Sequence, residues 1–305
     1  MERSKKSLVV PLLGYPGLKL TKTSVRQVLH NVDAHYETLH ACVDAFCPDA
    51  IFLLMDLTVE AEALGAKITV SENQPPSVAA HIISTEDDLK KRRIPDPAND
   101  GRLPLFVRVM ENMKKHLHIP KGAYVIGTLT LAGEIAGIKN VMKMLLKKSA
   151  FAEKLLEFTT EVSKGYARAL VSAGADIICI LEPSAALVSS NHFSTFSKPY
   201  VEAVSTSVNA ITVLHICGNT APIIPAMIKT KVNGISIDSA VDIIHVLRQV
   251  NNGMAVIGNI DPIKSMVFAS PEKIREKVLQ LRTQAAQCEM ALSSGCHKTC
   301  GEAHE

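Results

Sequence analysis

The sequence has no apolar run long enough to cross a membrane and no segment typical of a secretory signal. A membrane-spanning helix needs about 20 consecutive apolar residues. The apolar run nearest the amino terminus, residues 8–13, is short and contains Pro11. A signal peptide needs a longer apolar region followed by a cleavage site of small residues. We therefore expect a cytoplasmic protein that does not bind a membrane.

A concentrated basic surface is also missing. Charged residues make up 21% of the 305 residues, and the formal net charge is only +3. The lysines and arginines are mostly scattered, and no aromatic residues are interleaved with the few basic runs, so the footprint of a nucleic-acid-binding protein is absent. Hydrophobic residues reach 47%, which is enough for a sizeable buried core.

The seven cysteines do not have the spacing of a small disulfide-bonded scaffold, and their number is odd. In an intracellular chain of this size, most cysteines are buried apolar residues, and a few are metal ligands or reactive groups. Cys42, Cys47, Cys179 and Cys288 fall inside expected helices or strands, so we assign them to packing.

Short apolar or β-branched segments alternate with segments of helical periodicity along the chain. The expected strands are residues 8–13, 50–54, 123–126, 176–180, 211–215, 234–237, 255–258 and 290–292. Strands alternating with helices predict a parallel sheet with helical crossovers. Eight such units in a chain of this length favour a closed (β/α)8 TIM barrel over an open doubly wound sheet.

We expect one barrel domain over residues 1–305, with an excursion at about 67–100, where two proline-containing stretches interrupt the alternation. Few residues follow the eighth expected strand, so the sequence predicts a barrel that lacks its final carboxyl-terminal helix. One flank would then be exposed. Either a partner subunit covers it, as in a homodimer, or the sequence is truncated.

The segment with the strongest chemical signal is His215-Ile216-Cys217, where the fifth expected strand meets a Gly-Asn turn. Residues two apart in an extended chain point to the same side, and barrel enzymes hold their active sites at the carboxyl ends of the strands. An imidazole and a thiolate together favour zinc over magnesium or calcium. Alone, the pair is a weak signal, because such a pair is more often a core cysteine beside a hydrogen-bonded histidine.

A distant cysteine strengthens the zinc prediction. Cys296 follows the eighth expected strand, and strand ends remote in sequence converge at the mouth of a closed barrel. Three protein ligands with one open position are typical of a catalytic zinc. We therefore predict that His215, Cys217 and Cys296 form a catalytic metal site, with Asp238 as a weak fourth ligand or a metal-orienting group.

Other polar residues follow the ends of expected strands and are candidates for substrate binding. They are Asp56, Glu60, Glu182, Asn219, Asn259 and Asp261. Side chains at these points can contact substrate or orient the ligands of a metal. For each of them, a helix cap or a loop side chain is the alternative. His297 and Cys300, near the end of the chain, are predicted to be dispensable.

Five segments carry a resemblance to a known family: residues 55–65 (MDLTVEAEALG), 127–133 (GTLTLAG), 215–220 (HICGNT), 258–262 (GNIDP) and 293–296 (SSGC). Through them the sequence resembles the uroporphyrinogen decarboxylase superfamily, and within it the branch of corrinoid-dependent methyltransferases of the methylcobalamin:coenzyme M type. The His-x-Cys with a distant cysteine corresponds to that family's zinc signature.

The resemblance implies a barrel fold, a zinc ion held by His215, Cys217 and Cys296, and a corrinoid protein as partner. It implies transfer of a methyl group from a methyl-corrinoid to a small thiol such as coenzyme M, in methanogenesis or one-carbon metabolism. Zinc would make that thiol nucleophilic, because the thiolate is the reactive form.

Three other activities remain open. Homocysteine or another thiol could be the acceptor, or the barrel could bind a corrinoid or zinc without catalysis. Porphyrinogen decarboxylation is less expected, because the decarboxylases carry an arginine-rich segment after the first strand. Residues 11–17 of this sequence contain no arginine.

Overall fold

The structure is a computed structural model, and it describes residues 8–250, 253–285 and 288–294. Eight strands form one parallel sheet, in the spatial order β1-β10-β9-β8-β7-β6-β5-β2. Their bounds are β1 Leu8–Val9, β2 Ile51–Phe52, β5 Lys121–Ile126, β6 Ile177–Leu181, β7 Ile211–Ile216, β8 Gly234–Ile237, β9 Ala255–Ile260 and β10 Met290–Ser294. The first strand along the chain thus pairs with the last one.

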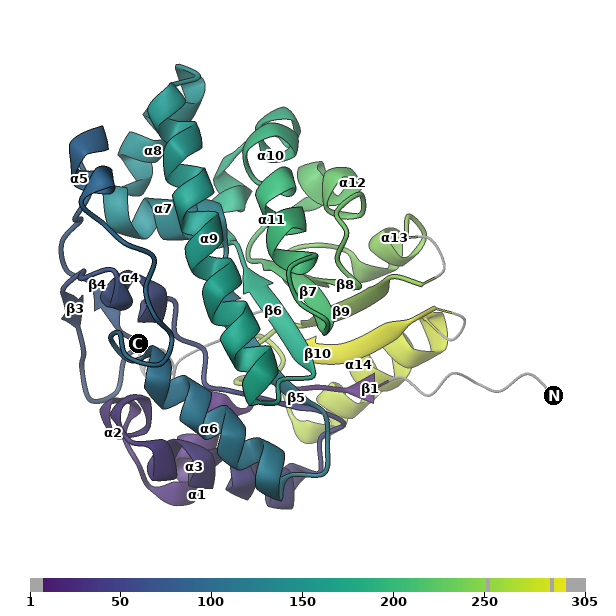
Figure 1. Cartoon of the computed structure of the whole chain (residues 1–305). Coiled ribbons are helices and arrows are strands. Elements are labelled where there is room, and N and C mark those ends of the chain that lie inside the picture. The colour runs from purple at the N-terminus through teal and green to yellow at the C-terminus, as the bar shows by residue number, and fades with distance from the viewer. Residues whose placement is uncertain (1–7, 251–252, 286–287, 295–305) are drawn as a thin grey trace.

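The sheet curls so that its two end strands approach each other. The backbone N–H of Asp49, just before β2, donates to the Val9 carbonyl oxygen at 3.0 Å. In return, the Val9 N–H donates to Asp49 Oδ2 at 2.7 Å. This arrangement, with helices around the outside of the sheet (Figure 1), confirms the predicted TIM-barrel-like fold.

Helices occupy most of the connections between the strands. The α-helices are α1 Gly14–Thr21, α2 Val25–His30, α3 Val32–Phe46, α4 Val59–Ala63, α5 Glu86–Lys90, α6 Leu103–His116, α7 Thr128–Ala136, α8 Ile138–Leu146, α9 Ala150–Ala173, α10 Ser190–Phe196, α11 Lys198–Ser205, α12 Ile224–Met227, α13 Ile243–Leu247 and α14 Pro271–Gln284. Two 3-10 helices, η1 Pro183–Leu187 and η2 Ala221–Ile223, follow β6 and β7. No helix in the described ranges is long and apolar enough to span a membrane.

Residues 67–100, which interrupt the alternation of strands and helices, contain a small second sheet. Strands β3 (Ile68–Thr69) and β4 (Ser77–Val78) pair antiparallel, and α5 follows them. The stretch ends in a bidentate ion pair, in which the guanidinium of Arg93 donates to both carboxylate oxygens of Asp100 at 2.7 Å. In Figure 1 this part lies to the left of the barrel, beside α4.

Alternate residues of each strand face the inside of the barrel. Cys179, Leu181 and Val213 form an apolar cluster there, together with Phe52, Tyr124 and Ile257. Their sequence neighbours, such as Ile180 and Leu214, belong instead to the large core between sheet and helices. His215 shares the parity of Val213, so its side chain points into the barrel at the carboxyl end of β7.

Candidate functional site

The candidate site begins with the pairing of β7 and β8. In this parallel register His215 lies opposite Ser236 on one side and opposite Leu181 of β6 on the other. His215 is buried, with 4% of its surface exposed. Its Nδ1 lies 3.0 Å from Ser236 Oγ, so a serine hydroxyl from the next strand fixes the plane of the imidazole ring.

The other ring nitrogen of His215 lies beside Cys217, the predicted second ligand. Nε2 lies 3.0 Å from the Sγ of Cys217, which is half-buried just after the end of β7. A histidine that binds a metal through Nε2 carries its proton on Nδ1. The hydroxyl oxygen of Ser236 is placed to accept a hydrogen bond from the protonated Nδ1 of His215. An imidazole nitrogen and a sulfur converging on one point are a donor pair that fits zinc.

The predicted third ligand, Cys296, lies outside the described residues, as do His297 and Cys300. Within the described ranges, no three or more His, Cys, Asp or Glu side chains are grouped to hold a metal ion. Asp238 is therefore not grouped with His215 and Cys217. Zinc binding by the full ligand set remains a prediction.

Asn259, in β9, forms hydrogen bonds to the loop between β8 and α13, which contains Asp238. The Asn259 amide Nδ2 donates to the carbonyl oxygens of Asp238 at 3.0 Å and Val241 at 2.6 Å. The Asp238 carboxylate accepts from the Ala240 N–H at 2.9 Å. Asn259 thus fixes the loop that carries Asp238, and Asp238 caps the turn that follows.

Asn219 and Asp261 lie in the turns after β7 and β9. Asn219 Oδ1 accepts a hydrogen bond from the Ala221 N–H at 3.2 Å. Asp261 Oδ1 accepts from the N–H groups of Ile263 and Lys264, both at 2.8 Å. These contacts shape the loops at the carboxyl ends of the strands. A role of either residue in substrate binding stays a prediction.

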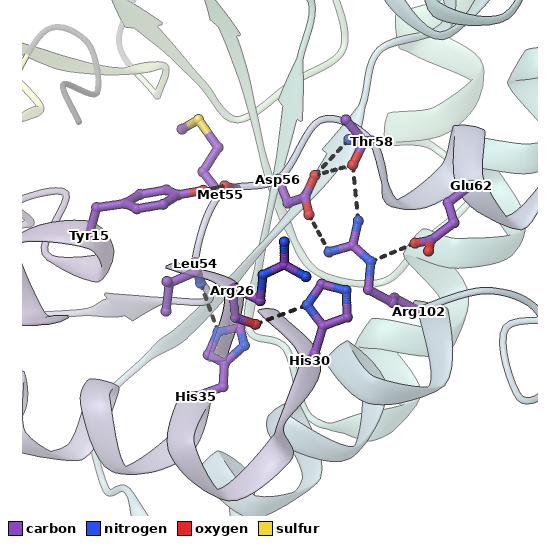
Figure 2. Close-up of polar contacts among 10 residues, drawn as sticks. All are labelled: Tyr15, Arg26, His30, His35, Leu54, Met55, Asp56, Thr58, Glu62 and Arg102. Atoms are coloured by element: carbon purple, nitrogen blue, oxygen red, sulfur yellow. Dashed lines mark hydrogen bonds and ion pairs between the residues drawn. The ribbon is translucent and has the colours of Figure 1, made fainter. Parts of the chain in front are cut away.

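Asp56 is part of a buried ionic network (Figure 2). Its side chain has no exposed surface, and its Oδ2 accepts from Arg102 Nη1 at 2.6 Å. Arg102 also donates from Nε to Glu62 at 2.5 Å and from Nη2 to the Thr58 hydroxyl at 3.0 Å. Because one guanidinium serves three partners, the network ties the loop after β2 and α4 to the start of α6.

Glu60 is buried beside the end of β5, with 1% of its surface exposed. Its Oε1 accepts from the Ile126 N–H at 2.8 Å. Burial raises the pKa of this carboxyl to about 8.

Glu182 approaches the same β5–α7 junction from β6. It accepts from the Leu129 and Thr130 N–H groups at 3.1 and 2.7 Å, and also from the Thr130 hydroxyl. The carboxylate thereby caps the first N–H groups of α7, where negative charge is favourable. Burial raises its pKa to about 7. Glu60 and Glu182 thus have structural roles, and binding of substrate by them stays a prediction.

Several residues of the site carried no clear sequence signal. Arg102 follows Asp56 by 46 positions, and nothing local marks it as a partner. Ser236 could have been found from strand parity, because it sits on the inward-facing side of an expected strand next to β7. Cys179 faces the lumen as a packing residue, and burial raises its pKa to about 12. Cys47 is exposed at the end of α3, so its assignment to packing was wrong.

Comparisons with known proteins agree with the barrel fold and identify the family. The model of the uroporphyrinogen decarboxylase (URO-D) family matches residues 15–301. A methylcobamide:CoM methyltransferase of Methanosarcina acetivorans is 29% identical over 285 residues, which cover 87% of this chain and 83% of that protein. Its counterpart in Methanosarcina mazei is 31% identical over 234 residues, 74% of this chain and 68% of that protein.

The chain is also similar to a decarboxylase and to a solved structure. The uroporphyrinogen decarboxylase of Trichodesmium erythraeum is 27% identical over 281 residues, with 87% of this chain and 77% of that protein covered. The solved structure of a methyltransferase from Methanosarcina mazei superposes with a TM-score of 0.89 at 26% identity, over 97% of this chain and 89% of that one.

The chain therefore belongs to the uroporphyrinogen decarboxylase family. Its relatives in Methanosarcina acetivorans and Methanosarcina mazei are methylcobamide:CoM methyltransferases, the solved structure is that of a methyltransferase, and the chain is a methyltransferase enzyme.

The capping of α7 by Glu182 predicts that Gly127 cannot carry a side chain. A Cβ on Gly127 would lie 2.5 Å from Glu182 Cδ. We expect Gly127→Ala to lower the free energy of unfolding by about 1–3 kcal/mol through overpacking. Urea denaturation followed by circular dichroism measures this.

The matched control is Gly165→Ala in α9, where nothing lies within 4 Å of the added Cβ. Alanine is favoured over glycine in a helix by up to about 1 kcal/mol, so this variant should be neutral or more stable. Equal stabilities of the two variants would contradict the proposed contact.

The contact between Ser236 and His215 predicts that the hydroxyl tunes metal binding. Loss of a hydrogen bond to the outer nitrogen of a histidine ligand weakens metal affinity by about 10- to 100-fold. We expect this loss in Ser236→Ala, measured as zinc competition with a chromophoric chelator. Ser236→Thr, which keeps a hydroxyl, should retain most of the affinity. Wild-type affinity in Ser236→Ala would show that the hydroxyl does not orient the ligand.

Proposed function

We propose that this methyltransferase moves a methyl group from a methyl-corrinoid, carried by a corrinoid protein, to a small thiol. His215, Cys217 and Cys296 would hold a zinc ion for this reaction. The observation that carries the proposal is the 3.0 Å approach of His215 Nε2 and Cys217 Sγ at the carboxyl end of β7. The names of the similar methyltransferases, methylcobamide:CoM methyltransferases, support both the corrinoid donor and a thiol acceptor.

The donor set fits the metal that the reaction needs. Zinc held by one imidazole and two sulfurs would lower the pKa of an acceptor thiol so that it is present as thiolate at neutral pH. Three protein ligands leave room for one exogenous ligand. The protein's own groups supply the rest, since Ser236 holds the ring of His215 and burial keeps water away from it.

The chemical step needs no protein acid or base at the methyl carbon. The thiolate sulfur forms a bond to the methyl carbon while the carbon–cobalt bond breaks. Both electrons of that bond stay on cobalt, which goes from Co(III) to Co(I), and the thiol proton has left to solvent beforehand. This balance is consistent with Glu60 and Glu182, the buried carboxyl groups with raised pKa, being engaged with the β5–α7 junction.

Decarboxylation of a porphyrinogen is the activity of other family members, and the present chain lacks a feature expected for it. The segment after β1, residues 11–17, leads into α1 without any arginine to bind the acidic side chains of such a substrate. The acceptor remains open between coenzyme M, homocysteine and other thiols.

The test is methyl transfer by the purified full chain, loaded with zinc. Methylcobalamin serves as donor, and coenzyme M, homocysteine and short alkyl thiols are offered in turn. Loss of the methyl group is followed by the cobalamin absorbance under anaerobic conditions. We expect turnover with at least one thiol, and a loss of at least about 100-fold in Cys217→Ser, since a catalytic ligand is removed.

The control is Cys47→Ser, which changes an exposed cysteine away from the barrel interior and should keep the wild-type rate. No demethylation with any thiol by the folded, zinc-loaded protein would overturn the proposal and leave a barrel that binds without catalysis. Full activity of Cys217→Ser would reject only the assignment of Cys217 as a ligand and would leave the proposed methyl transfer in place.

A further inference from the structure

Helix α8 carries a row of exposed lysines. Lys139, Lys143 and Lys147 follow one another at intervals of four residues, from the first turn of the helix to its C-cap, so they lie on one face. Lys148 comes directly after them, and residues 135–152 contain no aspartate or glutamate. All four lysines, which we call the α8 lysine row, are exposed. Because the whole chain has a formal net charge of only +3, the row is a local concentration of positive charge.

The row is unfavourable for the helix by itself. Like charges four residues apart repel each other on a helix surface. Lys139 lies in the first turn, which has no acidic residue, and a positive charge is unfavourable at that end of the helix dipole. Lys143 and Lys147 lie at the favourable end, but the dipole does not remove their mutual repulsion. The stability of α8 therefore does not explain the row.

Lysines on other surface helices are paired. Lysines of α5, α9 and α11 each form an ion pair with an acidic residue three or four positions away in the same helix. Within the described ranges, no aspartate or glutamate lies at ion-pair distance from any member of the α8 lysine row. Its positive charge is thus left for a partner outside the chain.

An apolar side chain lies on the same face of α8. Leu146, the last residue of the helix, is 70% exposed. It follows Lys143 by three positions and Lys139 by seven, so it shares their face. The opposite face carries Val141 and Leu145, which are buried in a core cluster with residues of α7 and α9. The helix thus presents to solvent a cationic face with one apolar side chain at its end.

The fold holds α8 at the end of the barrel where the candidate site lies. It follows α7, which begins at Thr128, just after β5 ends at Ile126, and which is capped by Glu182. In Figure 1, α7 and α8 lie together on the side to which the arrow of β6 points. The His215–Cys217 pair is at the carboxyl end of β7, which runs parallel to β6. A protein partner therefore approaches the site from the side on which α8 lies.

The chemistry of this face selects the kind of partner. A second copy of the chain would set the same lysines against each other in a two-fold symmetric dimer. A membrane-binding helix inserts an apolar face into the bilayer, but the apolar face of α8 is already buried in the core. An acidic protein surface supplies the opposite charge and can cover the exposed Leu146.

We propose that the α8 lysine row and Leu146 dock an acidic surface of the corrinoid protein that delivers the methyl group. This rests on the proposed function and names the surface through which its protein partner binds. The lysines attract the partner over a distance and raise the rate of encounter. A free methyl-corrinoid does not use this surface, because α8 contacts the protein and not the corrinoid. The two kinds of methyl donor therefore separate docking from chemistry.

The test compares two methyl donors on the zinc-loaded full chain. One is free methylcobalamin, and the other is methylated corrinoid protein purified from Methanosarcina mazei, the source of one of the similar methyltransferases. We expect Lys143→Glu to lower kcat/KM for the corrinoid protein by about tenfold or more at low ionic strength. Added salt should lower the wild-type value toward that of the variant, since salt screens exposed charges. The kcat/KM for methylcobalamin should stay at the wild-type value.

The same variant controls for folding. A glutamate at position 143 faces Lys139 and Lys147, each four residues away, so two repulsive contacts become attractive. We expect a melting temperature at least as high as that of wild type, so a weaker reaction with the corrinoid protein would not come from misfolding. Lys115→Glu makes the same change in net charge at the exposed end of α6, near the amino end of the barrel. It should keep the wild-type kcat/KM for both donors.

Equal kcat/KM of wild type and Lys143→Glu with the corrinoid protein would overturn the inference. An equal loss in Lys115→Glu would overturn it as well, because net charge alone would then explain the effect. Binding of the demethylated corrinoid protein, measured by calorimetry, separates the inference from the proposed function. Weaker binding to Lys143→Glu, in a protein that transfers no methyl group from either donor, would support docking and reject the proposed function.

A third probe tests the alternative partner. Vesicles of phosphatidylglycerol offer an anionic lipid surface without any protein, and their binding is measured by co-sedimentation. We expect no binding of the wild type to the vesicles at an ionic strength at which it binds the corrinoid protein. Binding to the vesicles through Lys143, without binding to the corrinoid protein, would assign α8 to a lipid surface and overturn the inference. Binding to neither would overturn it too.

Discussion

The parallel pairing of β7 with β8 is the constraint on which the rest of the site depends. It sets His215 opposite Ser236, so that one ring nitrogen is hydrogen-bonded and the other faces Cys217. A shift of one residue would turn the imidazole out of the barrel into the core, because side chains alternate across a strand. Register thus decides whether the histidine faces the inside of the barrel or the core between sheet and helices.

Around this pair, buried polar groups hold the loops at the carboxyl ends of the strands. Arg102 ties the loop after β2 to α6, Glu182 caps α7, and Asn259 holds the connection after β8. Each group satisfies backbone or ionic partners that would be costly to bury alone. These contacts hold the loops in place around the His215–Cys217 pair.

The sequence predicted the strands well, because each is a short apolar or β-branched run; residues 234–237 and β8 coincide. Helical periodicity does not mark α7, because Thr128–Ala136 is buried on nearly all sides and so has no polar stripe. The break between α2 and α3 is likewise hard to see in the sequence, because it depends on Asn31, which is extended and caps α3 by accepting from the Ala34 N–H. For the site, His215 and Cys217 could be paired by local spacing, whereas the contact of Asp56 with Arg102 depends on the tertiary fold alone.

The central claim is that a histidine and two cysteines from remote parts of the chain share one zinc ion. Zinc X-ray absorption spectroscopy of the metal-loaded full-length protein measures this directly. The account predicts two sulfur neighbours at about 2.3 Å together with nitrogen or oxygen neighbours at about 2.0–2.1 Å. A zinc environment without sulfur, or a folded protein that fails to retain zinc, would contradict it.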